Sequence, residues 1–279
     1  FGMLGTCCPC CEFLTSACAI RPPGKKTAPD DTMSYLLLTG ATGLLGSYLL
    51  GAALRAGRRV AVVSRASRTE SIGQRIEALV VRWERESGRV LPRPVVLEGD
   101  LHQPDLGLDA RRLRWVARHC HAVLHCAASL TFESGNRDEE PWRSNLDGTR
   151  HVLELCRRTG IREYHHVSTA YVCGLREGRV LETELDEGQS FANDYERSKA
   201  EAEKIVRSAE FLDPPTIYRP AIIVGDSRTG HTTTFHGFYA PLKIMHAMVY
   251  QIGATDVSNA SYLEVLGLTG REKKNFVPV

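Results

Sequence analysis

Tyr195 and Lys199 lie four residues apart in a segment rich in alanine, glutamate and lysine, a composition that predicts a helix. The spacing places both side chains on one helical face. A phenol with a pKa of about 10 is a poor proton donor or base at neutral pH, and an adjacent ammonium group stabilises its phenolate and brings it into working range. The pair therefore indicates proton transfer to or from an oxygen atom.

The same spacing recurs at Tyr239 and Lys243, where Pro241 lies between the two residues and disturbs a helix. No strand end with a hydroxyl side chain precedes that pair at a comparable distance. We therefore interpret the second pair as a chance match.

A pair of hydroxyl side chains, Ser168 and Thr169, marks the end of a predicted strand that precedes the helix of Tyr195. Ligands of parallel sheets bind beyond the carboxyl ends of the strands, so these hydroxyls are placed to polarise a carbonyl group beside Tyr195. We assign that role to Thr169 and interpret Ser168 as capping the strand end. Tyr171, two residues further on, is expected to pack.

A glycine-rich turn directly follows the first predicted strand and reads Gly40-Ala41-Thr42-Gly43-Leu44-Leu45-Gly46. Glycines at three-residue spacing permit a tight turn, close approach of the backbone to a pyrophosphate, and close packing of the next helix on the sheet. The N–H groups at the start of that helix favour an anion. The candidate cofactor-binding residues here are Gly40, Thr42, Gly43, Leu44, Leu45 and Gly46.

The end of the second predicted strand decides which dinucleotide is favoured, and there the chain reads Ser64-Arg65-Ala66-Ser67-Arg68. A carboxylate at this place holds a free ribose 2′-hydroxyl, whereas a cation holds a 2′-phosphate. Arg65 therefore favours NADP, because a guanidinium grips phosphate through two hydrogen bonds. Arg68 fits this role and that of a solvated loop charge equally well.

Two further segments are expected to line the cofactor. Asp100-Leu101, just past the third predicted strand, is placed to meet the adenine. Ala127-Ala128 follows the fourth strand and would line the cofactor with its backbone.

These residues need a scaffold, and the sequence predicts a doubly wound parallel sheet of the Rossmann type, an α/β fold. Short apolar runs alternate with amphipathic stretches, and runs such as Leu36-Leu37-Leu38 are continuously apolar, as expected of strands covered on both faces. A helix after the glycine turn is expected to end near Gly57, and another at Gly160. The predicted strands are residues 35–39, 59–64, 95–98, 122–126, 164–168 and 216–219.

Composition restricts the function classes. The 279 residues carry 35 basic and 33 acidic side chains, a formal charge of +2, which gives no global field for nucleic acid. No apolar run is long enough to span a membrane. Cysteines are sparse after residue 32 and lie in apolar runs, so we expect a reduced, cytoplasmic protein.

Residues 1–32 show neither helical nor strand periodicity, and we expect a disordered or non-native leader before Met33. The stretch from Cys7 to Cys11 contains two overlapping Cys-x-x-Cys spacings, but no second ligand pair follows nearby. The histidines that flank two strands have no cysteine or carboxylate at ligand spacing either. No metal site is predicted.

Several of these motifs together resemble the extended short-chain dehydrogenase/reductases, namely the glycine turn, Ser168-Thr169 and Tyr195-x-x-x-Lys199. Within that group the chain is most similar to the thioester reductase domains of carboxylic acid reductases and nonribosomal peptide synthetases, to which fatty acyl-CoA reductases are related. The segments that carry the closer likeness are 99–101, 104–108, 125–128, 145–149 and 167–172.

The resemblance covers Met33 to Gly225 well. It implies catalytic roles for Thr169, Tyr195 and Lys199, with Lys199 also holding the nicotinamide ribose and Arg65 the NADP phosphate. We therefore expect an NADP-binding domain over residues 33–225. Residues 226–279 are expected to form a partial substrate-binding lobe. The resemblance implies that family members continue through a substrate-binding region and return to the sheet through a strand similar to Asn275–Val279, where this chain stops.

The leading hypothesis is an NADPH-dependent reductase of acyl thioesters, carried on coenzyme A or on a carrier protein, that forms an aldehyde or an alcohol. One alternative keeps the fold and changes the substrate to a sugar nucleotide or a hydroxysteroid. Another is a cofactor-binding scaffold without turnover. The sequence leaves the acyl chain, its carrier and the oligomeric state open.

Overall fold

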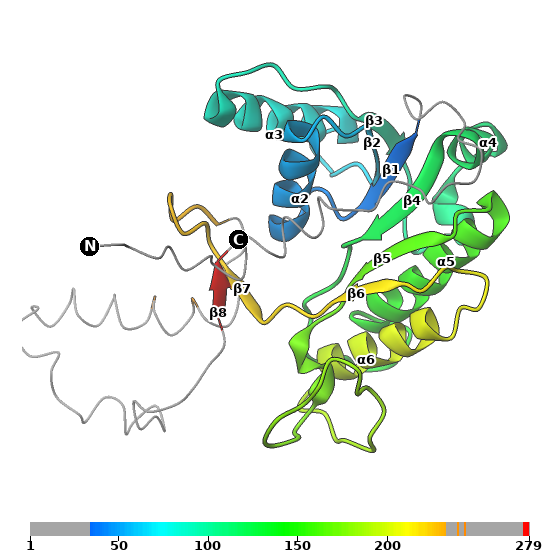
Figure 1. Cartoon of the computed structure of the whole chain (residues 1–279), viewed down its shortest axis with the longest axis vertical. Helices are drawn as coiled ribbons and strands as arrows, with labels where there is room; N and C mark the ends of the chain where they lie inside the picture. Colours follow the sequence, from blue (N-terminus) through cyan, green and yellow to red (C-terminus); the bar gives the residue numbers. More distant parts are fainter. Residues whose placement is uncertain (1–33, 233–238, 240–242, 244–275, 279) are drawn as a thin grey trace, which may run out of the picture. The chain divides into compact units, whose positions relative to one another are not determined.

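The computed structural model describes residues 34–232, 239, 243 and 276–278 (Figure 1). The predicted leader, residues 1–32, its Cys-x-x-Cys spacings and most of the predicted lobe of residues 226–279 lie outside these residues. The chain divides into two compact units, Phe1–Ala221 and Ile222–Val279. The candidate catalytic and cofactor-binding residues belong to the first unit.

The first unit is built on a six-stranded parallel sheet with the order β3-β2-β1-β4-β5-β6. The chain winds outward from β1 to β3, returns to the other side of β1, and then winds outward again to β6. This doubly wound topology confirms the predicted Rossmann fold. The strands are β1 (Tyr35–Thr39), β2 (Val60–Ser64), β3 (Val95–Glu98), β4 (Cys120–His125), β5 (Glu163–Val167) and β6 (Thr216–Tyr218).

The predicted strands agree with these bounds to within two residues, and β1 and β3 agree at both ends. β4 and β5 end one residue earlier than predicted, at His125 and Val167. Cys126 and Ser168 are therefore the first residues beyond the sheet edge.

Helices cover both faces of the sheet. The helices are α2 (Leu44–Arg55), α3 (Ile72–Ser87), α4 (Ala110–His119), α5 (Gly148–Thr159) and α6 (Asp194–Arg207). In Figure 1, α2 and α3 pack together, and α4, α5 and α6 form a second group. Because both faces are covered, Leu36, Leu37 and Leu38 are all buried, as their continuous apolar run predicts.

Local sequence signals set the helix ends. At the start of α3, the Ser71 hydroxyl accepts from the Gln74 backbone and the Ser71 backbone N–H donates to the Gln74 side chain, which forms a capping box. Asn193 caps α6 by accepting from the backbone of Glu196. α5 ends at Gly160 as predicted, whereas α2 ends at Arg55, two residues before Gly57.

The second unit contains a short parallel pair, β7 (Ile222–Val224) and β8 (Phe276–Pro278). β7 was not predicted from the sequence. The resemblance suggested that the Asn275–Val279 segment returns to the main sheet, but β8 pairs with β7 in a two-stranded sheet instead. A three-residue strand in a run such as Ala221-Ile222-Ile223-Val224 carries too short a pattern to assign its pairing.

None of the helices in the described part of the chain combines the length and the apolar character needed to cross a bilayer.

Candidate active site

The candidate site lies at the carboxyl edge of the parallel sheet, where the chain leaves β1, β4 and β5 and where α6 begins. Ligands of doubly wound folds bind at this edge, close to the point where the strand order reverses. Here that point lies between β1 and β4. The glycine turn follows β1, and Ala127-Ala128 follows β4.

The glycine turn is held by two close backbone contacts. Gly40 adopts a φ of +75°, and a Cβ atom on it would lie 2.5 Å from the Ala127 nitrogen. A Cβ on Gly46 would lie 2.0 Å from the Gly40 carbonyl oxygen. These two glycines are needed for the turn itself and for the packing of α2 against it.

Gly43 differs from these two glycines, because it is exposed and a Cβ on it would touch only the Gly40 oxygen, at 3.4 Å. It is also the N-cap of α2, which has no side-chain cap. The start of the helix is therefore open to an anion, with Thr42 and Leu45 half-buried beside it and Leu44 buried beneath.

This difference predicts opposite outcomes for two alanine substitutions. Gly46→Ala should lower the melting temperature strongly or prevent folding, because overpacking against backbone costs about 1–3 kcal/mol or more. Gly43→Ala should melt close to the parent protein and bind a dinucleotide more weakly. Thermal denaturation and calorimetric titration of both variants measure this. Equal stability of the two proteins would contradict the assigned packing role of Gly46.

Cations gather beyond β2. Arg65 and Arg68 are both exposed, and Arg75 of α3 donates to the Arg65 carbonyl oxygen at 3.2 Å. A turn in which the Ser67 hydroxyl accepts from the backbone of Glu70 shapes the loop. Arg75 was not predicted to belong to this group of cations, because it lies ten residues from Arg65 in the sequence and inside a helical pattern.

The segment after β3 is fixed by a left-handed turn. Asp105 and Leu106 have φ values of +53° and +57°, and the Leu106 carbonyl accepts from the backbone of Asp100 at 2.8 Å. The Leu101 carbonyl lies 2.6 Å from His151 Nδ1 of α5. Asp100 and Leu101 are therefore held between the β3 edge and α5, at the edge of the sheet where cofactors of this fold bind.

Thr169, Tyr195 and Lys199 are brought together by the end of β5 and the first two turns of α6. The Thr169 hydroxyl is hydrogen-bonded to the Tyr195 phenol. Lys199 is 2% exposed and its Nζ donates to the Val167 carbonyl at 2.7 Å. The ring of Phe132 packs edge-on against Tyr195, with centroids 6.0 Å apart.

The protonation equilibria differ from the expectation that Lys199 lowers the pKa of Tyr195. Burial raises the pKa of Tyr195 to about 12, and the hydrogen bond from Thr169 opposes the rise only in part. Burial lowers the pKa of Lys199 to about 8, against the attraction of Cys126 and Glu203. The ammonium hydrogen-bonds the Val167 backbone rather than the phenol, so desolvation governs both groups.

Ser168 is held by a buried charge cluster rather than facing the reacting centre. Its hydroxyl donates to Glu203 Oε2 at 2.7 Å. Glu203 is 0% exposed and also accepts from Arg219 and Arg207. Because Tyr195, Lys199 and Glu203 succeed one another at four-residue steps on α6, this cluster fixes the face of the helix that carries Tyr195 and Lys199 against β5 and β6.

A second buried network joins the end of β1 to α6. The Thr149 hydroxyl donates to the Asn145 carbonyl at 2.6 Å, so it accepts from His125 Nε2 at 3.2 Å. His125 Nδ1 then accepts from the Thr39 hydroxyl, at 2.7 Å. The Asn145 side chain donates to Ser198 Oγ at 2.9 Å.

Asn145 lies in a single π-helical turn, Arg143–Asp147, directly before α5. No separate role was predicted for Asn145, because a π-helical turn leaves no periodic pattern in the sequence. Glu203 lies four residues after Lys199, and this helical spacing is the signal in the sequence that could have indicated it.

Tyr239 belongs to the second Tyr-x-x-x-Lys pair, which we interpreted as a chance match. Its hydroxyl accepts from the Gly225 backbone at 2.8 Å, within the second unit. Tyr171 is half-buried, and burial raises its pKa.

In the part of the chain that the structure describes, no group of three or more histidine, cysteine or acidic residues is arranged to hold a metal ion. The cysteines of this part, Cys120, Cys126, Cys156 and Cys173, are free thiols.

The fold and the open glycine turn define the class of this protein as a dinucleotide-binding protein of the Rossmann type. Comparison with known families identifies a family within this class. Residues 38–266 match a family of NAD-binding proteins described as male sterility protein. The chain belongs to this family.

Individual relatives agree with that assignment. The chain is 28% identical, over 94% of its length, to an isonitrile lipopeptide synthase of Mycobacterium tuberculosis. It is 23% identical, over 82% of its length, to the fatty acyl-CoA reductase wat of Drosophila melanogaster. It spans 11% of the first relative and 51% of the second.

Among solved structures, the terminal R domain from the myxalamid PKS-NRPS biosynthetic pathway is similar to this chain. The TM-score is 0.67 at 33% identity, and the match covers 80% of this chain and 57% of that domain.

Proposed function

We propose that this protein is an NADPH-dependent reductase of acyl thioesters. The observation that carries the proposal is the grouping of Thr169, Tyr195 and Lys199 at the carboxyl edge of the sheet, beside an open glycine turn. The names of the relatives support it, since they include a fatty acyl-CoA reductase and the terminal R domain of a biosynthetic pathway.

The residues present fit a dinucleotide. The N–H groups that start α2 would hold the pyrophosphate, because Gly43 leaves that helix end open and Gly40 and Gly46 leave no room for side chains. Arg65 would hold the 2′-phosphate, Asp100-Leu101 would meet the adenine, and Ala127-Ala128 and Lys199 would line the nicotinamide half. The bound nicotinamide supplies a hydride.

The side chains of Thr169 and Tyr195 would then stabilise the negative charge that develops on the substrate oxygen. As the carbonyl carbon gains the hydride, Thr169 and Tyr195 hydrogen-bond the developing oxyanion, and the Tyr195 phenol gives it a proton. A pKa of about 12 keeps that phenol protonated at neutral pH, as a proton donor requires. Breaking the carbon–sulfur bond of the resulting hemithioacetal releases an aldehyde and a thiol.

An apolar acyl chain suits the surroundings of Tyr195. Phe132, which packs directly on the tyrosine ring, is 48% exposed, and Leu130, two residues earlier in the chain, is 47% exposed. Half-exposed apolar side chains next to a reacting group favour a hydrocarbon over a sugar. We therefore favour the acyl thioester over a sugar nucleotide.

The test is to follow NADPH absorbance with a series of acyl-CoA thioesters and to measure thiol and aldehyde together. Stoichiometric release of both supports the proposal. If NADPH were oxidised in the presence of a sugar nucleotide or a steroid, but not with any of the thioesters, the alternative substrate class would be supported instead. Dinucleotide binding without turnover of any substrate would identify a scaffold.

Cofactor choice gives a separate prediction. Arg65→Ser should weaken NADPH binding at least tenfold, about 1.4 kcal/mol, and leave NADH binding nearly unchanged, since only NADPH carries the phosphate. Calorimetric titration with both cofactors measures this. A parallel loss for both would show that Arg65 shapes the loop and does not read the phosphate.

A further inference from the structure

α4 carries a concentration of positive charge that the proposed chemistry does not use. The segment from Asp109 to His119 holds four arginines and one aspartate, a formal charge of +3, which exceeds the +2 of the whole chain. These arginines, Arg111, Arg112, Arg114 and Arg118, are all exposed. The rest of the chain carries a net formal charge of −1, so α4 and its cap form a net positive segment of a nearly neutral chain.

Twelve of the 22 described arginines outside α4 form an ion pair with a carboxylate. On the neighbouring helix α5, for example, Arg157 pairs with Glu154 and Arg158 pairs with Asp105. On α4, Arg112 pairs with Asp109 at 3.7 Å, and Arg111 also interacts electrostatically with the Asp109 carboxylate. Within the described residues, Arg114 and Arg118 form no ion pair.

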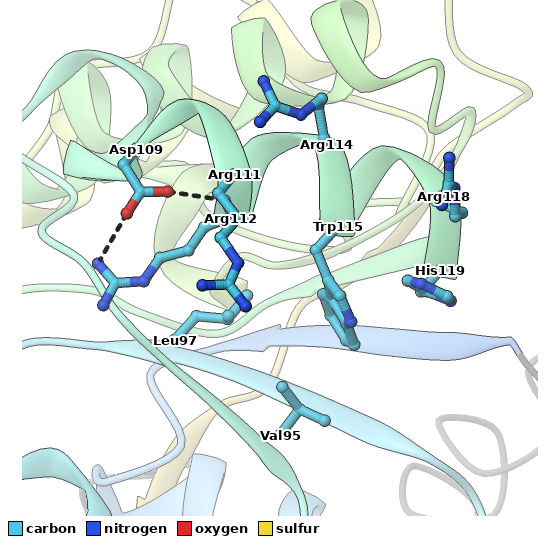
Figure 2. A pocket seen from close by; sticks show the side chains of 9 residues that line it. All are labelled: Val95, Leu97, Asp109, Arg111, Arg112, Arg114, Trp115, Arg118 and His119. Carbon is cyan, nitrogen blue, oxygen red and sulfur yellow. Dashed lines mark hydrogen bonds and ion pairs between the residues drawn. The ribbon is translucent and has the colours of Figure 1, made fainter.

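A pocket of about 480 Å³ lies between α4 and the edge strand β3 (Figure 2). Its floor is apolar, with Val95 and Leu97 from β3 and the Trp115 ring from α4, and Val95 and Trp115 point toward one another. The arginines of α4 surround this floor. The site can therefore accept an apolar group whose neighbours are negatively charged.

The arrangement of the arginines follows helical periodicity. Arg111, Arg114 and Arg118 are spaced by three and four residues, so they share one face of α4 over about 10 Å. Acidic side chains one turn apart on a partner helix have the same spacing. A guanidinium group also binds a carboxylate through two parallel hydrogen bonds.

We propose that α4 and its pocket, which we name the α4 pocket, dock an acidic amphipathic helix of a protein partner, with one apolar side chain inserted against Trp115. A nucleic acid fits less well, because three arginines on one face over about two helical turns give too few phosphate contacts and the apolar floor has no counterpart in a sugar-phosphate backbone. A free phosphate would be attracted to the start of α4, but the Asp109 carboxylate caps it.

The test uses the folded protein and synthetic helical peptides of roughly 16 residues. One peptide carries glutamates at three- and four-residue spacing around a single leucine, a second has glutamine in place of each glutamate, and a third has serine in place of the leucine. Fluorescence anisotropy should give the tightest binding for the first peptide, with at least tenfold weaker binding for the other two.

Variants place the binding on α4. The double variant Arg114→Glu/Arg118→Glu should bind the acidic peptide at least tenfold more weakly than the parent, and high salt should weaken the parent complex. Arg85→Glu, an exposed arginine on α3, is the matched control and should bind normally. Equal binding by the double variant, or tighter binding of a DNA duplex than of the acidic peptide, would overturn the proposal. The result does not depend on reductase activity.

Discussion

Tyr195→Phe should reduce turnover of an acyl-CoA thioester by about 10² or more while NADPH affinity changes little. The substitution keeps the ring, and with it the edge-on contact to Phe132, and removes only the hydroxyl that is bonded to Thr169. Reduction needs a proton and a hydrogen bond to the developing oxyanion, and in the proposed mechanism this one group supplies both. Steady-state kinetics and a cofactor titration on the same preparation measure the two quantities.

The control for this prediction is Tyr239→Phe, which removes the hydroxyl of the other tyrosine at the same spacing from a lysine. That hydroxyl accepts from the Gly225 backbone, so its loss should leave turnover near the parent value. If Tyr239→Phe abolished turnover and Tyr195→Phe remained active, the chemistry would have to be assigned to the second unit.

Lys199→Met should lose at least about 10² in turnover and should also bind NADPH more weakly, because a ribose contact and a positive charge near the phenol are lost together. The parent enzyme should lose activity as the pH rises through about 8, where the buried ammonium gives up its proton. A turnover that stays high in the methionine variant would remove Lys199 from the mechanism.

The same variant has a stability signature whose sign follows from the lowered pKa. Between pH 8 and the ordinary lysine value of 10.5, the unfolded parent chain binds more protons than the folded one, so parent stability rises with pH across this window. Below pH 8 the cost of burying the charge is present in full. The methionine variant should therefore gain stability relative to the parent at pH 7, and this difference should shrink toward pH 10. Thermal denaturation at several pH values measures it.

The sequence carried enough information for the fold because buried parallel strands leave continuous apolar runs and glycine turns leave fixed spacings. β1 and β3 were predicted residue for residue on that basis. Strand ends at β4 and β5 were not, because Cys126 and Ser168 are compatible with a strand and only sheet pairing excludes them.

The site was predicted less completely than the fold. Spacing along α6 singled out Tyr195 and Lys199, but Glu203 needed its partners Ser168 and Arg219 from distant segments to be recognised. Likewise, the raised pKa of Tyr195 comes from burial, which is a property of the folded surroundings and not of the local sequence.

The hydrogen-bonded chain through His125 has a consequence for experiments that vary pH. Burial lowers the pKa of His125 to about 3 and holds that of His166 well below its usual range, and it raises the pKa of Cys126 to about 12. Together with Tyr195, these groups keep a constant charge between pH 5 and 9. Burial lowers the pKa of the neighbouring Lys199 to about 8, so we expect its ammonium group to produce an inflection near pH 8 in a kinetic profile.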